Sequence, residues 1–437
     1  MAKTATVHSW TRVTAEGQLK GSVSVPPSKS YTHRAVLMAS LADGVSRISN
    51  PLLSRDTNAT IAACGAFGAA VEGKGRSIRI EGTRPRVPDD VVNVENSGTT
   101  LRFMTSAMSL APEGHVVLTG DASIRRRPMQ PLLDTLAQLG VKAWSSRGNG
   151  CAPIIVKAGG MRGGKASIRG DVSSQFISSL LISTPLAEKD TALSVADAVS
   201  RPYIEMTLRL GKIFGVKVES KGYSEFKVPA GQEYSPADFV VPADFSSASF
   251  IVAAASLLGG RVRIDNLDAS LPQGDARIIE IAKRMGARVS SERGGLVVSS
   301  DGEWLTGGTF DLGDTPDLLP VVAALALRAD SPVVIVGTAH ARFKETDRIA
   351  IVAKELSKLG VMVKERDDGL RILPKPRLHA APLDAHDDHR MFMAFSLASM
   401  LIPGGTPIVG AESLDVSYPT FLEDIKRLGA KVKTEQG

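Results

Sequence analysis

The apolar and polar positions of this chain follow one pattern that recurs six times. In each copy an apolar stretch with helical spacing ends at a glycine, and the alternating apolar and polar residues of a strand follow. The six copies read CGAFGAAV, LAQLGVKA, GKIFGVKV, AKRMGARV, LSKLGVMV and IKRLGAKV. Their last glycines, at steps of roughly 72 residues, are Gly68, Gly140, Gly215, Gly286, Gly360 and Gly429. One such match is a common helix-to-strand connection, but six at even spacing predict six units that span the chain.

Each unit is predicted to continue with a β-hairpin. The repeated glycine takes the left-handed conformation that ends a helix, and the strand after it leads into a turn. Glycine or Asp-Gly stands between two strand-like runs in EGKGRSIRI, SSRGNGCAPIIV, ESKGYSEFKV, SSERGGLVVS and KERDDGLRIL, as a hairpin requires. The sixth unit ends at KVKTEQG without a second strand, whereas GSVSV near the N-terminus is strand-like and has no hairpin partner. We therefore expect GSVSV to complete the last unit.

This organisation predicts an α/β protein with two pseudo-symmetric domains of three units each. Because the N-terminal strand would join the last unit, residues 1–27 and 243–437 are expected to form one domain, and residues 28–242 the other, inserted domain. The chain would cross between the domains near residues 26–28 and 241–244. Ligands often bind between domains, so we expect the active site in the interdomain cleft.

The composition restricts the class of protein. With 437 residues, 43% of them apolar, the chain can fill two domain cores without disulfides or structural metals. Its two cysteines, Cys64 and Cys151, lack metal-ligand spacing and suit a reducing cytoplasm, so we expect no metal site. No stretch approaches the roughly 18 apolar residues of a membrane span, and the N-terminal residues do not resemble a signal peptide. We expect a cytoplasmic protein with no membrane partner.

The positive charge does not require a nucleic-acid partner. The net charge is +6, but 46 acidic residues are mixed among 52 basic ones, and the chain has no long basic run. Aromatic residues make up only 5%, so there is no evident platform for stacking single-stranded bases. A small substrate with several negative charges explains the surplus as well as nucleic acid does, and no nucleic-acid partner is expected.

Three predicted helix starts upstream of residue 180 carry groups that suit an anion. PPSKSYTHR places cations in a first turn, where they oppose the helix macrodipole unless an anion binds. NSGTTLR offers a glycine for close backbone approach, and GDVSSQF offers hydroxyl and amide groups. Capping explains each segment alone, but the three together favour a ligand with several oxygen atoms. The candidate residues are Lys29, Ser30, Arg34, Gly98, Thr99, Arg102, Ser173, Ser174 and Gln175.

A second group of charged residues mixes arginine and lysine with carboxylates. Arg125, Arg126 and Arg127 precede a helix, and at least one of them is expected to point into a pocket. A solvated turn explains the other two, and surface ion pairs are the simpler explanation for the mixed charges of KETDR and DHRM. However, arginine binds carboxylate and phosphate bidentately, and a carboxylate beside a lysine can be tuned for proton transfer. The further candidates are Asp317, Lys344, Glu345, Asp347, Arg348, His389 and Arg390, with Asp244 interpreted as structural.

The chain resembles the 3-phosphoshikimate 1-carboxyvinyltransferase (EPSP synthase) family in an ordered set of motifs. These are SKSYTHR, NSGTTLR, RRRP, VSSQF, SRPYIE, DTPD, KETDR, DHRM and SYPTF, from about residue 17 to the C-terminus. The resemblance implies two domains, each built from three βαβαββ units. It also implies transfer of the enolpyruvyl group of phosphoenolpyruvate to the 5-hydroxyl of shikimate 3-phosphate, by addition and then elimination of phosphate, on the route to chorismate. No metal or organic cofactor is implied.

The resemblance assigns roles to residues at matching positions. Asp317 matches the proton acceptor, Glu345 is a candidate for proton delivery, and Lys29 reaches both substrates. Residues that match shikimate 3-phosphate ligands are Lys29, Ser30, Arg34, Ser173, Ser174, Gln175, Ser200, Asp317 and Lys344. Residues that match phosphoenolpyruvate ligands are Lys29, Gly98, Arg127, Gln175, Arg348 and Arg390. The family further implies glyphosate as an inhibitor at the phosphoenolpyruvate site, and we expect a monomer.

Three positions depart from the family pattern. Val416 stands where many bacterial members carry lysine, Phe103 where many have proline, and His340 where an asparagine ligand is usual. These differences affect the expected affinity and glyphosate sensitivity but leave the reaction in place. We also expect Lys29 and Arg127 to be exposed cations that contribute little to folding stability.

Two related families are alternatives. The enolpyruvyl transferase that acts on UDP-N-acetylglucosamine has a Lys-Asn pair in place of Lys29 and Ser30, and usually a reactive cysteine in the loop corresponding to Gly120–Pro128, where this chain has none. An RNA 3′-phosphate cyclase would bind ATP and react through a histidine, whereas the resemblance above already accounts for His33, His340 and His389. Phosphate release from shikimate 3-phosphate and phosphoenolpyruvate would separate the three families.

Overall fold

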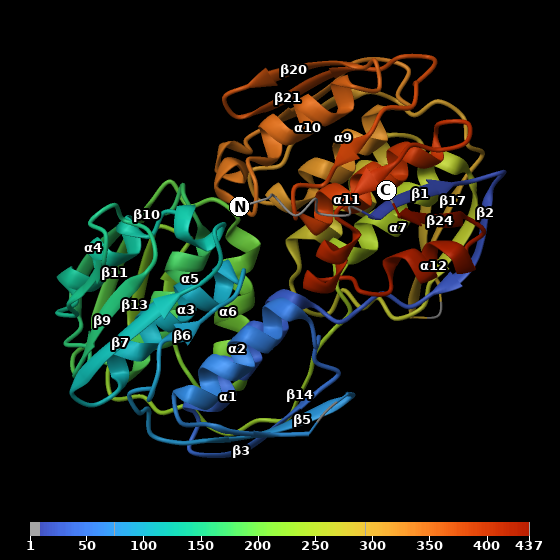
Figure 1. Ribbon diagram of the computed structural model, residues 1–437. Helices are drawn as coiled ribbons and strands as arrows, with labels where there is room; N and C mark the ends of the chain where they lie inside the picture. Colours follow the sequence, from blue (N-terminus) through green and yellow to red (C-terminus); the bar gives the residue numbers. More distant parts are fainter. Residues whose placement is uncertain (1–8, 74, 293, 437) are drawn as a thin grey trace. The chain divides into compact units, whose positions relative to one another are not determined.

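The computed structural model describes residues 9–73, 75–292 and 294–436, in which helices and strands alternate along the chain (Figure 1). Within these residues the strands form six sheets of four strands each. The mixed α/β architecture confirms the predicted fold class. No helix in the described part of the chain is long and apolar enough to cross a membrane.

The third unit shows how each sheet is built. Its elements are β10 (Gly164–Arg169), α5 (Ser174–Ser183), β11 (Thr191–Ala196), α6 (Arg201–Ile213), β12 (Glu219–Lys221) and β13 (Glu225–Val228). β10 and β11 are parallel, and the β12–β13 hairpin continues the sheet with antiparallel pairs, in the order β10-β11-β13-β12. Alternate residues of β11 are buried, because the helices cover one face of the sheet.

The other five units repeat this order with the following elements. The first contains α1 (Lys29–Leu41), β3 (Gly44–Ser49), α2 (Arg55–Ala66), β4 (Ala70–Glu72) and β5 (Ser77–Gly82). The second contains β6 (Val92–Asn93), α3 (Gly98–Ala107), β7 (Gly114–Thr119), α4 (Gln130–Gln138), β8 (Ala143–Ser145) and β9 (Ile154–Ala158). The fourth contains α7 (Phe245–Leu258), β15 (Gly260–Ile264), α8 (Ile278–Arg284), β16 (Arg288–Glu292) and β17 (Gly295–Ser300).

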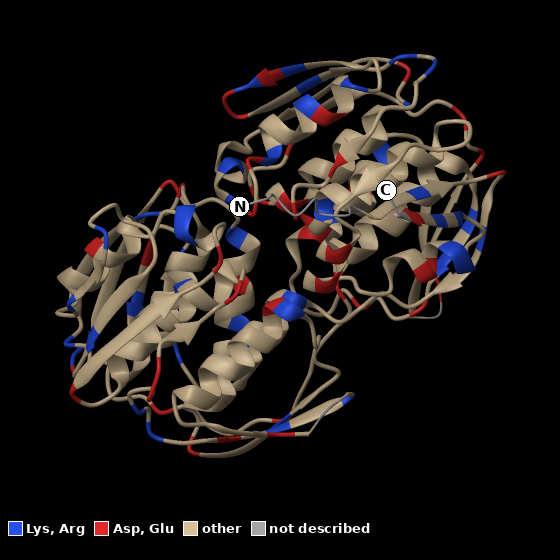
Figure 2. Ribbon diagram, viewed as in Figure 1, with Lys and Arg blue, Asp and Glu red and all other residues tan. Residues whose placement is uncertain are grey.

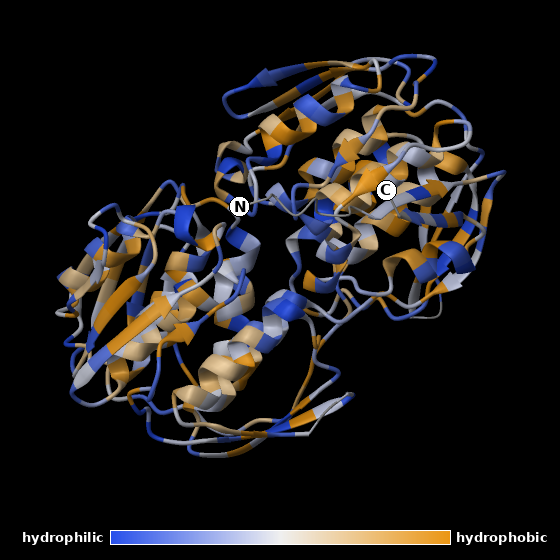
Figure 3. Ribbon diagram, viewed as in Figure 1, coloured by the Kyte–Doolittle hydropathy of each residue, from blue (hydrophilic) through white to orange (hydrophobic). Residues whose placement is uncertain are grey.

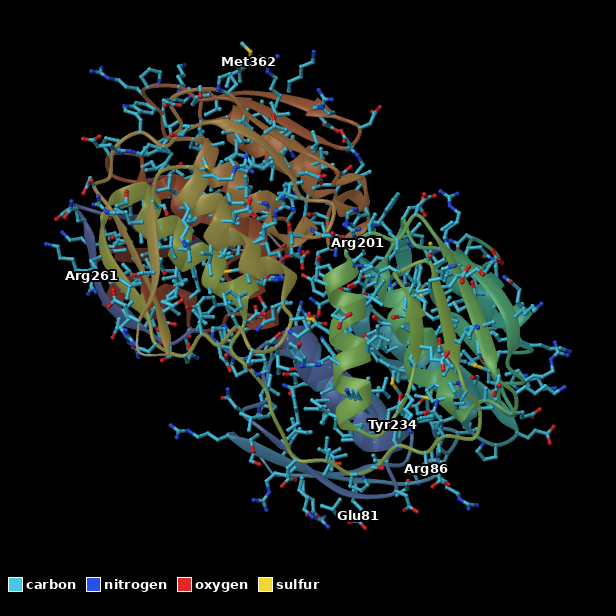
Figure 4. The ribbon with its side chains drawn as sticks, turned by 180° about the vertical axis from the view of Figure 1, so that it is seen from behind. Glu81, Arg86, Arg201, Tyr234, Arg261 and Met362 are labelled. Atoms are coloured by element: carbon cyan, nitrogen blue, oxygen red, sulfur yellow. The ribbon has the colours of Figure 1, made fainter. Side chains whose placement is uncertain are left out.

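The last two units follow the same pattern. The fifth contains β18 (Gly308–Asp311), α9 (Leu319–Ala326), β19 (Val333–Val336), α10 (Arg348–Ser357), β20 (Met362–Arg366) and β21 (Gly369–Leu373). The sixth contains β22 (Leu383–Asp384), α11 (His389–Met400), β23 (Ile408–Val409), α12 (Phe421–Arg427) and β24 (Lys431–Gln436). The hairpin β20–β21 is on the outside of its unit, where the side chain of Met362 is 66% exposed and points away from the ribbon (Figure 4).

The six repeated glycines end helices, as predicted. All have positive φ, from 84° at Gly215 to 126° at Gly68. Five directly follow the C-cap residue of α2, α4, α6, α8 or α12, and Gly360 lies two residues after the C-cap of α10. Glycine is favoured at this position because it adopts the left-handed conformation without steric cost. The predicted hairpins of the first five units also form.

The expectation that GSVSV completes the last unit is wrong. Most of this segment forms β2 (Leu19–Val23), which pairs in parallel with β15 and supplies the first strand of the fourth unit. The strand that completes the sixth unit is β1 (Ser9–Thr14), antiparallel to β24. In the same way β14 (Phe239–Val240) pairs in parallel with β3 and supplies the first strand of the first unit. Thr11 and Val13, two residues apart in β1, are both buried. Their spacing of two, with Arg12 between them, was the sequence signal for this strand.

The chain divides into two compact parts, here called lobe 1 and lobe 2. Lobe 1 comprises the chain up to Pro26, Ala243–Ala269 and everything from Asp275 onward. Lobe 2 comprises Pro27–Pro242 and the short segment Ser270–Gly274. That segment belongs with lobe 2 because Tyr31 of α1 donates a hydrogen bond to the carbonyl of Pro272 at 2.9 Å. Each lobe has its own apolar core.

Each lobe packs around three inner helices, which are the first helices of its units. These are α1, α3 and α5 in lobe 2, and α7, α9 and α11 in lobe 1. Every residue of α3, α9 and α11 is buried. Helices buried on all sides are expected in the core of a large domain, whereas the second helices of the units expose one polar face (Figure 3). The starts of the inner helices carry most of the candidate site residues.

Candidate active site

In lobe 2, side chains at the starts of α3 and α5 contact one another. Gln175 in the first turn of α5 accepts a hydrogen bond from Arg102 Nη1 through its Oε1 at 2.6 Å. Its Nε2 donates to Thr99 Oγ1 at 2.9 Å. Ser173 caps α5, since its hydroxyl accepts the backbone N–H of Gln175 at 3.3 Å. The amide of Gln175 therefore has a fixed orientation, set by two residues of another helix.

Gly98 and Arg127 lie side by side. Gly98 is the first residue of α3, and a Cβ added there would overlap Nη1 of Arg127 and lie 3.4 Å from Nη1 of Arg102. The lack of a side chain at Gly98 thus leaves the room that Arg127 occupies. Arg127 is 5% exposed, whereas Arg125 and Arg126 are exposed to solvent. The prediction that Arg127 is an exposed cation is therefore wrong.

Lys29, at the start of α1, forms an ion pair inside lobe 2. Its Nζ lies 2.8 Å from Oδ2 of Asp56 in the first turn of α2, and its side chain is only 14% exposed. Burial would raise the pKa of Asp56, but the charge of Lys29 and the neighbouring His33 ring hold that pKa well below its ordinary value. The prediction of an exposed Lys29 is wrong, and because Asp56 is a buried carboxylate paired with it, we now expect Lys29 to contribute to stability.

Arg34 is buried in the interior of lobe 2 and is 1% exposed. Its hydrogen-bond acceptors are Thr207 Oγ1, Ser178 Oγ and the carbonyls of Ser30 and Tyr203. Its guanidinium also lies over the ring of Phe103, 5.2 Å from the centroid, so the unusual Phe103 packs against this cation. Burial lowers the pKa of Arg34 to about 10, although Tyr31 and Tyr203 oppose the shift. Four of the five N–H donors of Arg34 are used within the lobe.

The remaining lobe 2 candidates are serines at helix starts. Ser30 lies in the first turn of α1 and Ser174 begins α5. Ser200 precedes α6 with φ of 52°, a left-handed conformation that is uncommon for residues other than glycine. Backbone strain of this kind is found preferentially at functional sites, so the conformation of Ser200 supports its place among the candidates.

In lobe 1, residues from the starts of three inner helices meet at Arg390. Its Nη1 donates to the hydroxyl of Ser246 in α7, and its Nη2 lies 3.1 Å from Oδ2 of Asp317. Asp317 belongs to a short 3-10 helix, η5 (Pro316–Leu318), immediately before α9. The other oxygen of Asp317 lies 2.7 Å from Nη1 of Arg348 and 3.4 Å from Nζ of Lys344. One carboxylate thus contacts three cations.

Arg348 is surrounded by carboxylates and is 1% exposed. Its Nε lies 2.8 Å from Asp388 Oδ2, and its Nη2 lies 2.8 Å from Glu345 Oε2, in addition to the Asp317 contact. Burial would lower the pKa of Arg348, but the three carboxylates outweigh burial and raise that pKa. Burial would likewise raise the pKa of Asp388, and Arg348 holds it below its ordinary value. Arg348 therefore links Asp317, Glu345 and Asp388.

Sequence reasoning missed three buried carboxylates next to these cations: Asp56, Asp275 and Asp388. Asp388 caps α11 by accepting the backbone N–H of Arg390 at 2.9 Å, and its place in DHRM, before an apolar run, was a usable signal. Asp56 resembles an ordinary first-turn acid after the Ser54 cap. Asp275 is 3% exposed, and burial together with Asp317 raises its pKa to about 6, against the influence of Arg390 and Ser246. No sequence pattern distinguishes Asp275.

The departures from the family pattern are buried side chains. Val416 ends the 3-10 helix η7 (Ala411–Val416) and supplies no cation. His340 is 4% exposed in η6 (Ala339–Phe343). Among the described residues no group of three or more histidine, cysteine, aspartate or glutamate side chains is arranged to hold a metal ion.

The candidate site residues thus fall into two groups, one in each lobe, and most of them lie at the starts of helices. The lobe 2 group contains Lys29, Ser30, Arg34, Gly98, Arg127, Ser173, Ser174, Gln175 and Ser200. The lobe 1 group contains Asp317, Lys344, Glu345, Arg348 and Arg390. Along the ribbon, positions of Lys and Arg are interspersed with positions of Asp and Glu (Figure 2). Six repeated α/β units therefore carry guanidinium, ammonium and carboxylate groups, most of them at helix starts.

The comparisons with known proteins specify the family. The family model for EPSP synthase (3-phosphoshikimate 1-carboxyvinyltransferase) matches residues 13–425. The chain is similar to the 3-phosphoshikimate 1-carboxyvinyltransferase of Methanocella arvoryzae, with 47% identity over 94% of this chain and 97% of the relative. The corresponding protein of Methanocaldococcus jannaschii is 44% identical over 96% of this chain and 98% of its own length. The chain belongs to the EPSP synthase family.

A solved structure agrees with this assignment. The EPSP synthase of Acinetobacter baumannii covers 98% of this chain with a TM-score of 0.82 and 27% sequence identity, and all of that chain is matched. The comparisons confirm the predicted family, the two-domain βαβαββ fold class and the enzyme class of carboxyvinyl transferase. They do not favour the UDP-N-acetylglucosamine transferase or the RNA 3′-phosphate cyclase.

Proposed function

We propose that this chain transfers the carboxyvinyl group of phosphoenolpyruvate to the 5-hydroxyl of shikimate 3-phosphate, releasing phosphate, with the charged groups of both lobes as its substrate ligands. The observation that best supports this proposal is Asp317, a carboxylate in contact with the side chains of Lys344, Arg348 and Arg390. A proton acceptor held among fixed cations is what a reaction between polyanionic substrates requires.

The substrate ligands are proposed from the family motifs. Shikimate 3-phosphate would bind Lys29, Ser30, Arg34, Ser173, Ser174, Gln175, Ser200, Asp317 and Lys344. Phosphoenolpyruvate would bind Lys29, Gly98, Arg127, Gln175, Arg348 and Arg390. The adjacency of Gly98 and Arg127 and the fixed amide of Gln175 support a shared ligand site in lobe 2. Binding between the two domains, divided at residues 27 and 243, remains a prediction.

Two of these ligands, Arg34 and Arg348, already have partners inside their lobes. Arg34 has one N–H donor beyond its four internal hydrogen bonds, and Arg348 is shared by three carboxylates. A substrate anion would therefore compete with Asp317 and Glu345 for Arg348. Displacing a carboxylate from a guanidinium also raises that carboxylate's affinity for protons, which suits groups proposed to exchange protons.

The chemistry proceeds by addition and elimination. Asp317 accepts the proton of the 5-hydroxyl as this oxygen attacks C2 of phosphoenolpyruvate, and Glu345 delivers a proton to C3. In the second stage C3 loses a proton, the double bond re-forms and phosphate leaves. Lys29, Arg127 and Arg390 stabilise the negative charges of the tetrahedral intermediate, and the ordering of both substrates lowers the entropic part of the barrier.

The proposal includes three finer points. Glyphosate would compete with phosphoenolpyruvate at the Gly98 and Arg127 site. The enzyme would act as a cytoplasmic monomer. It would need no metal or organic cofactor, since every group in the proposed reaction belongs to a side chain or a substrate.

A phosphate-release assay tests the proposed function. The wild-type protein should release phosphate from phosphoenolpyruvate only when shikimate 3-phosphate is present, and not with UDP-N-acetylglucosamine. Replacing Asp317 by Asn should lower turnover by at least about 100-fold, within the range known for positioned acid–base groups. A matched Asp415→Asn variant, at an exposed carboxylate of η7, should retain wild-type turnover. Phosphate release with UDP-N-acetylglucosamine, or full turnover in Asp317→Asn, would contradict the proposal.

A further inference from the structure

A buried chain of polar side chains connects the starts of α1, α2 and α3 in lobe 2. His33 Nδ1 lies 2.6 Å from Thr60 Oγ1, and Thr60 Oγ1 lies 2.6 Å from Thr100 Oγ1. Thr100 Oγ1 in turn lies 2.6 Å from the hydroxyl of Ser97, the N-cap residue of α3. These four side chains are at most 1% exposed. The motifs and proposed ligands account for none of these contacts.

The other end of the chain meets the Lys29 ion pair. His33 Nε2 lies 3.7 Å from Asp56 Oδ2, the oxygen that also binds Lys29 Nζ at 2.8 Å. The series therefore runs from Lys29 through Asp56 and His33 to the two threonines. It ends one residue before Gly98.

The charge of Asp56 determines which atom donates in each hydrogen bond. Burial lowers the pKa of His33, although Asp56 opposes the shift, so the ring is neutral and carries one N–H. Because Asp56 is a carboxylate, the ring proton is stabilised on Nε2, facing it, and Nδ1 must accept the hydroxyl proton of Thr60. Thr60 then accepts from Thr100, and Thr100 accepts from Ser97.

The cap of α3 is consistent with this direction. The backbone N–H of Thr100 donates to Ser97 Oγ at 3.2 Å, so the Ser97 oxygen acts as an acceptor there while its own proton points to Thr100 Oγ1. If the donors of these hydrogen bonds pointed the opposite way, Nδ1 of His33 would carry the proton. Nε2 would then present a lone pair to the Asp56 carboxylate, which is unfavourable in a buried site. All donors therefore point from the α3 cap toward Asp56.

We infer that Asp56, His33, Thr60 and Thr100 are positioning residues: the one-directional hydrogen bonds from Ser97 to His33, continued by the 3.7 Å contact of His33 with Asp56 and by the Asp56–Lys29 ion pair, fix the Lys29 ammonium relative to the start of α3 at Gly98. The inference rests on the proposed function, because Lys29 and Gly98 are proposed ligands. With the Lys29 ammonium held at a fixed position relative to the backbone at Gly98, an anion can bind both groups in a rigid site. Small displacements of such binding groups slow reactions strongly.

Substitutions at Thr100 test the role of the chain in catalysis. Thr100→Val keeps the side-chain shape and removes the hydroxyl, and it should lower kcat/KM for phosphoenolpyruvate by about 10 to 100-fold. Thr100→Ser keeps the hydroxyl and should stay within about threefold of wild type. The matched control is Thr105→Val in the same helix, a buried threonine whose hydroxyl bonds only the carbonyl of Leu101 at 2.6 Å. It should leave the kinetics unchanged. Equal losses in Thr100→Val and Thr105→Val, or no rescue by serine, would overturn the inference.

A spectroscopic measurement tests the chain without relying on activity. Imidazole ¹⁵N shifts of the wild-type protein, with His33 assigned by its loss in His33→Gln, should show a neutral ring protonated at Nε2 at pH 7 to 8. A ring protonated at Nδ1, or at both nitrogens, would refute the proposed direction. If wild-type protein releases no phosphate from the two substrates while the tautomer is as expected, the proposed function fails and the hydrogen-bond chain stands.

Discussion

Gly98→Ala is the substitution whose consequence the structure defines most closely. The added methyl group would overlap Nη1 of Arg127, whose guanidinium is held in a buried position. An ordinary contact of about 3.5 Å requires the guanidinium to move by about 1 Å. Gly98 does not have positive φ, so alanine is compatible with the backbone, and folding stability should change little.

The size of the effect follows from the proposed ligand role of Arg127. One methyl group in a tight site discriminates by about 1–3 kcal/mol, or roughly 10 to 200-fold. Glyphosate is longer than phosphoenolpyruvate, and we expect its inhibition constant to rise by that factor. The Michaelis constant for phosphoenolpyruvate should rise less, by up to about tenfold.

Steady-state kinetics with both ligands provide the assay. The control is Gly65→Ala, since a Cβ at this α2 position meets no atom within 4 Å. That variant should keep both constants and gain stability by up to about 1 kcal/mol, because alanine is the better helix former. Equal losses for glyphosate and phosphoenolpyruvate in Gly98→Ala, or no loss at all, would show that Gly98 and Arg127 do not form the phosphoenolpyruvate site.

Three further predictions concern buried charges and thiols. Lys29→Ala should destabilise the protein by about 3–5 kcal/mol in urea unfolding, because it leaves Asp56 buried without its cation, and adding Asp56→Asn should restore part of that loss. The raised pKa of Asp275, about 6 against 3.8, means that the native state keeps a proton that the unfolded chain has lost, so this residue makes stability fall by about 2 kcal/mol as pH rises from 4 to 6. Asp275→Asn should therefore gain stability relative to wild type over that interval, and a constant difference would disprove the assignment. Burial raises the pKa of Cys64 to about 12 and also raises that of Cys151, so iodoacetamide at pH 7 should not inactivate the enzyme, and rapid inactivation would contradict this expectation.

The repeated glycines made most of the fold predictable. Each marks a helix end that depends on local backbone conformation, so Gly68 and its counterparts could be recognised without knowledge of the tertiary structure. Strand pairing near the N-terminus depends on contacts far apart in sequence, and local pattern could not decide whether β1 or β2 pairs with β24. The error with GSVSV arose from that limit.

The candidate site was predictable as a set of residues but not as a set of contacts. Motif matches selected Asp317, Arg348 and Arg390, whose side chains do meet. The sequence gives no information on the burial of Lys29 or on its pairing with Asp56, because these depend on the packing of α1 against α2. Ionic partners that come from a neighbouring helix require the tertiary structure.

Isotope incorporation from solvent tests the proposed addition–elimination most directly. Protonation of C3 makes a methyl group in the tetrahedral intermediate, and its deprotonation during elimination removes any one of three hydrogens. In deuterium oxide the enolpyruvyl methylene of the product should therefore contain deuterium, and phosphoenolpyruvate recovered before completion should contain it only when shikimate 3-phosphate is present. Product formed with no deuterium at this carbon would contradict the mechanism proposed for Asp317, Glu345 and the surrounding cations.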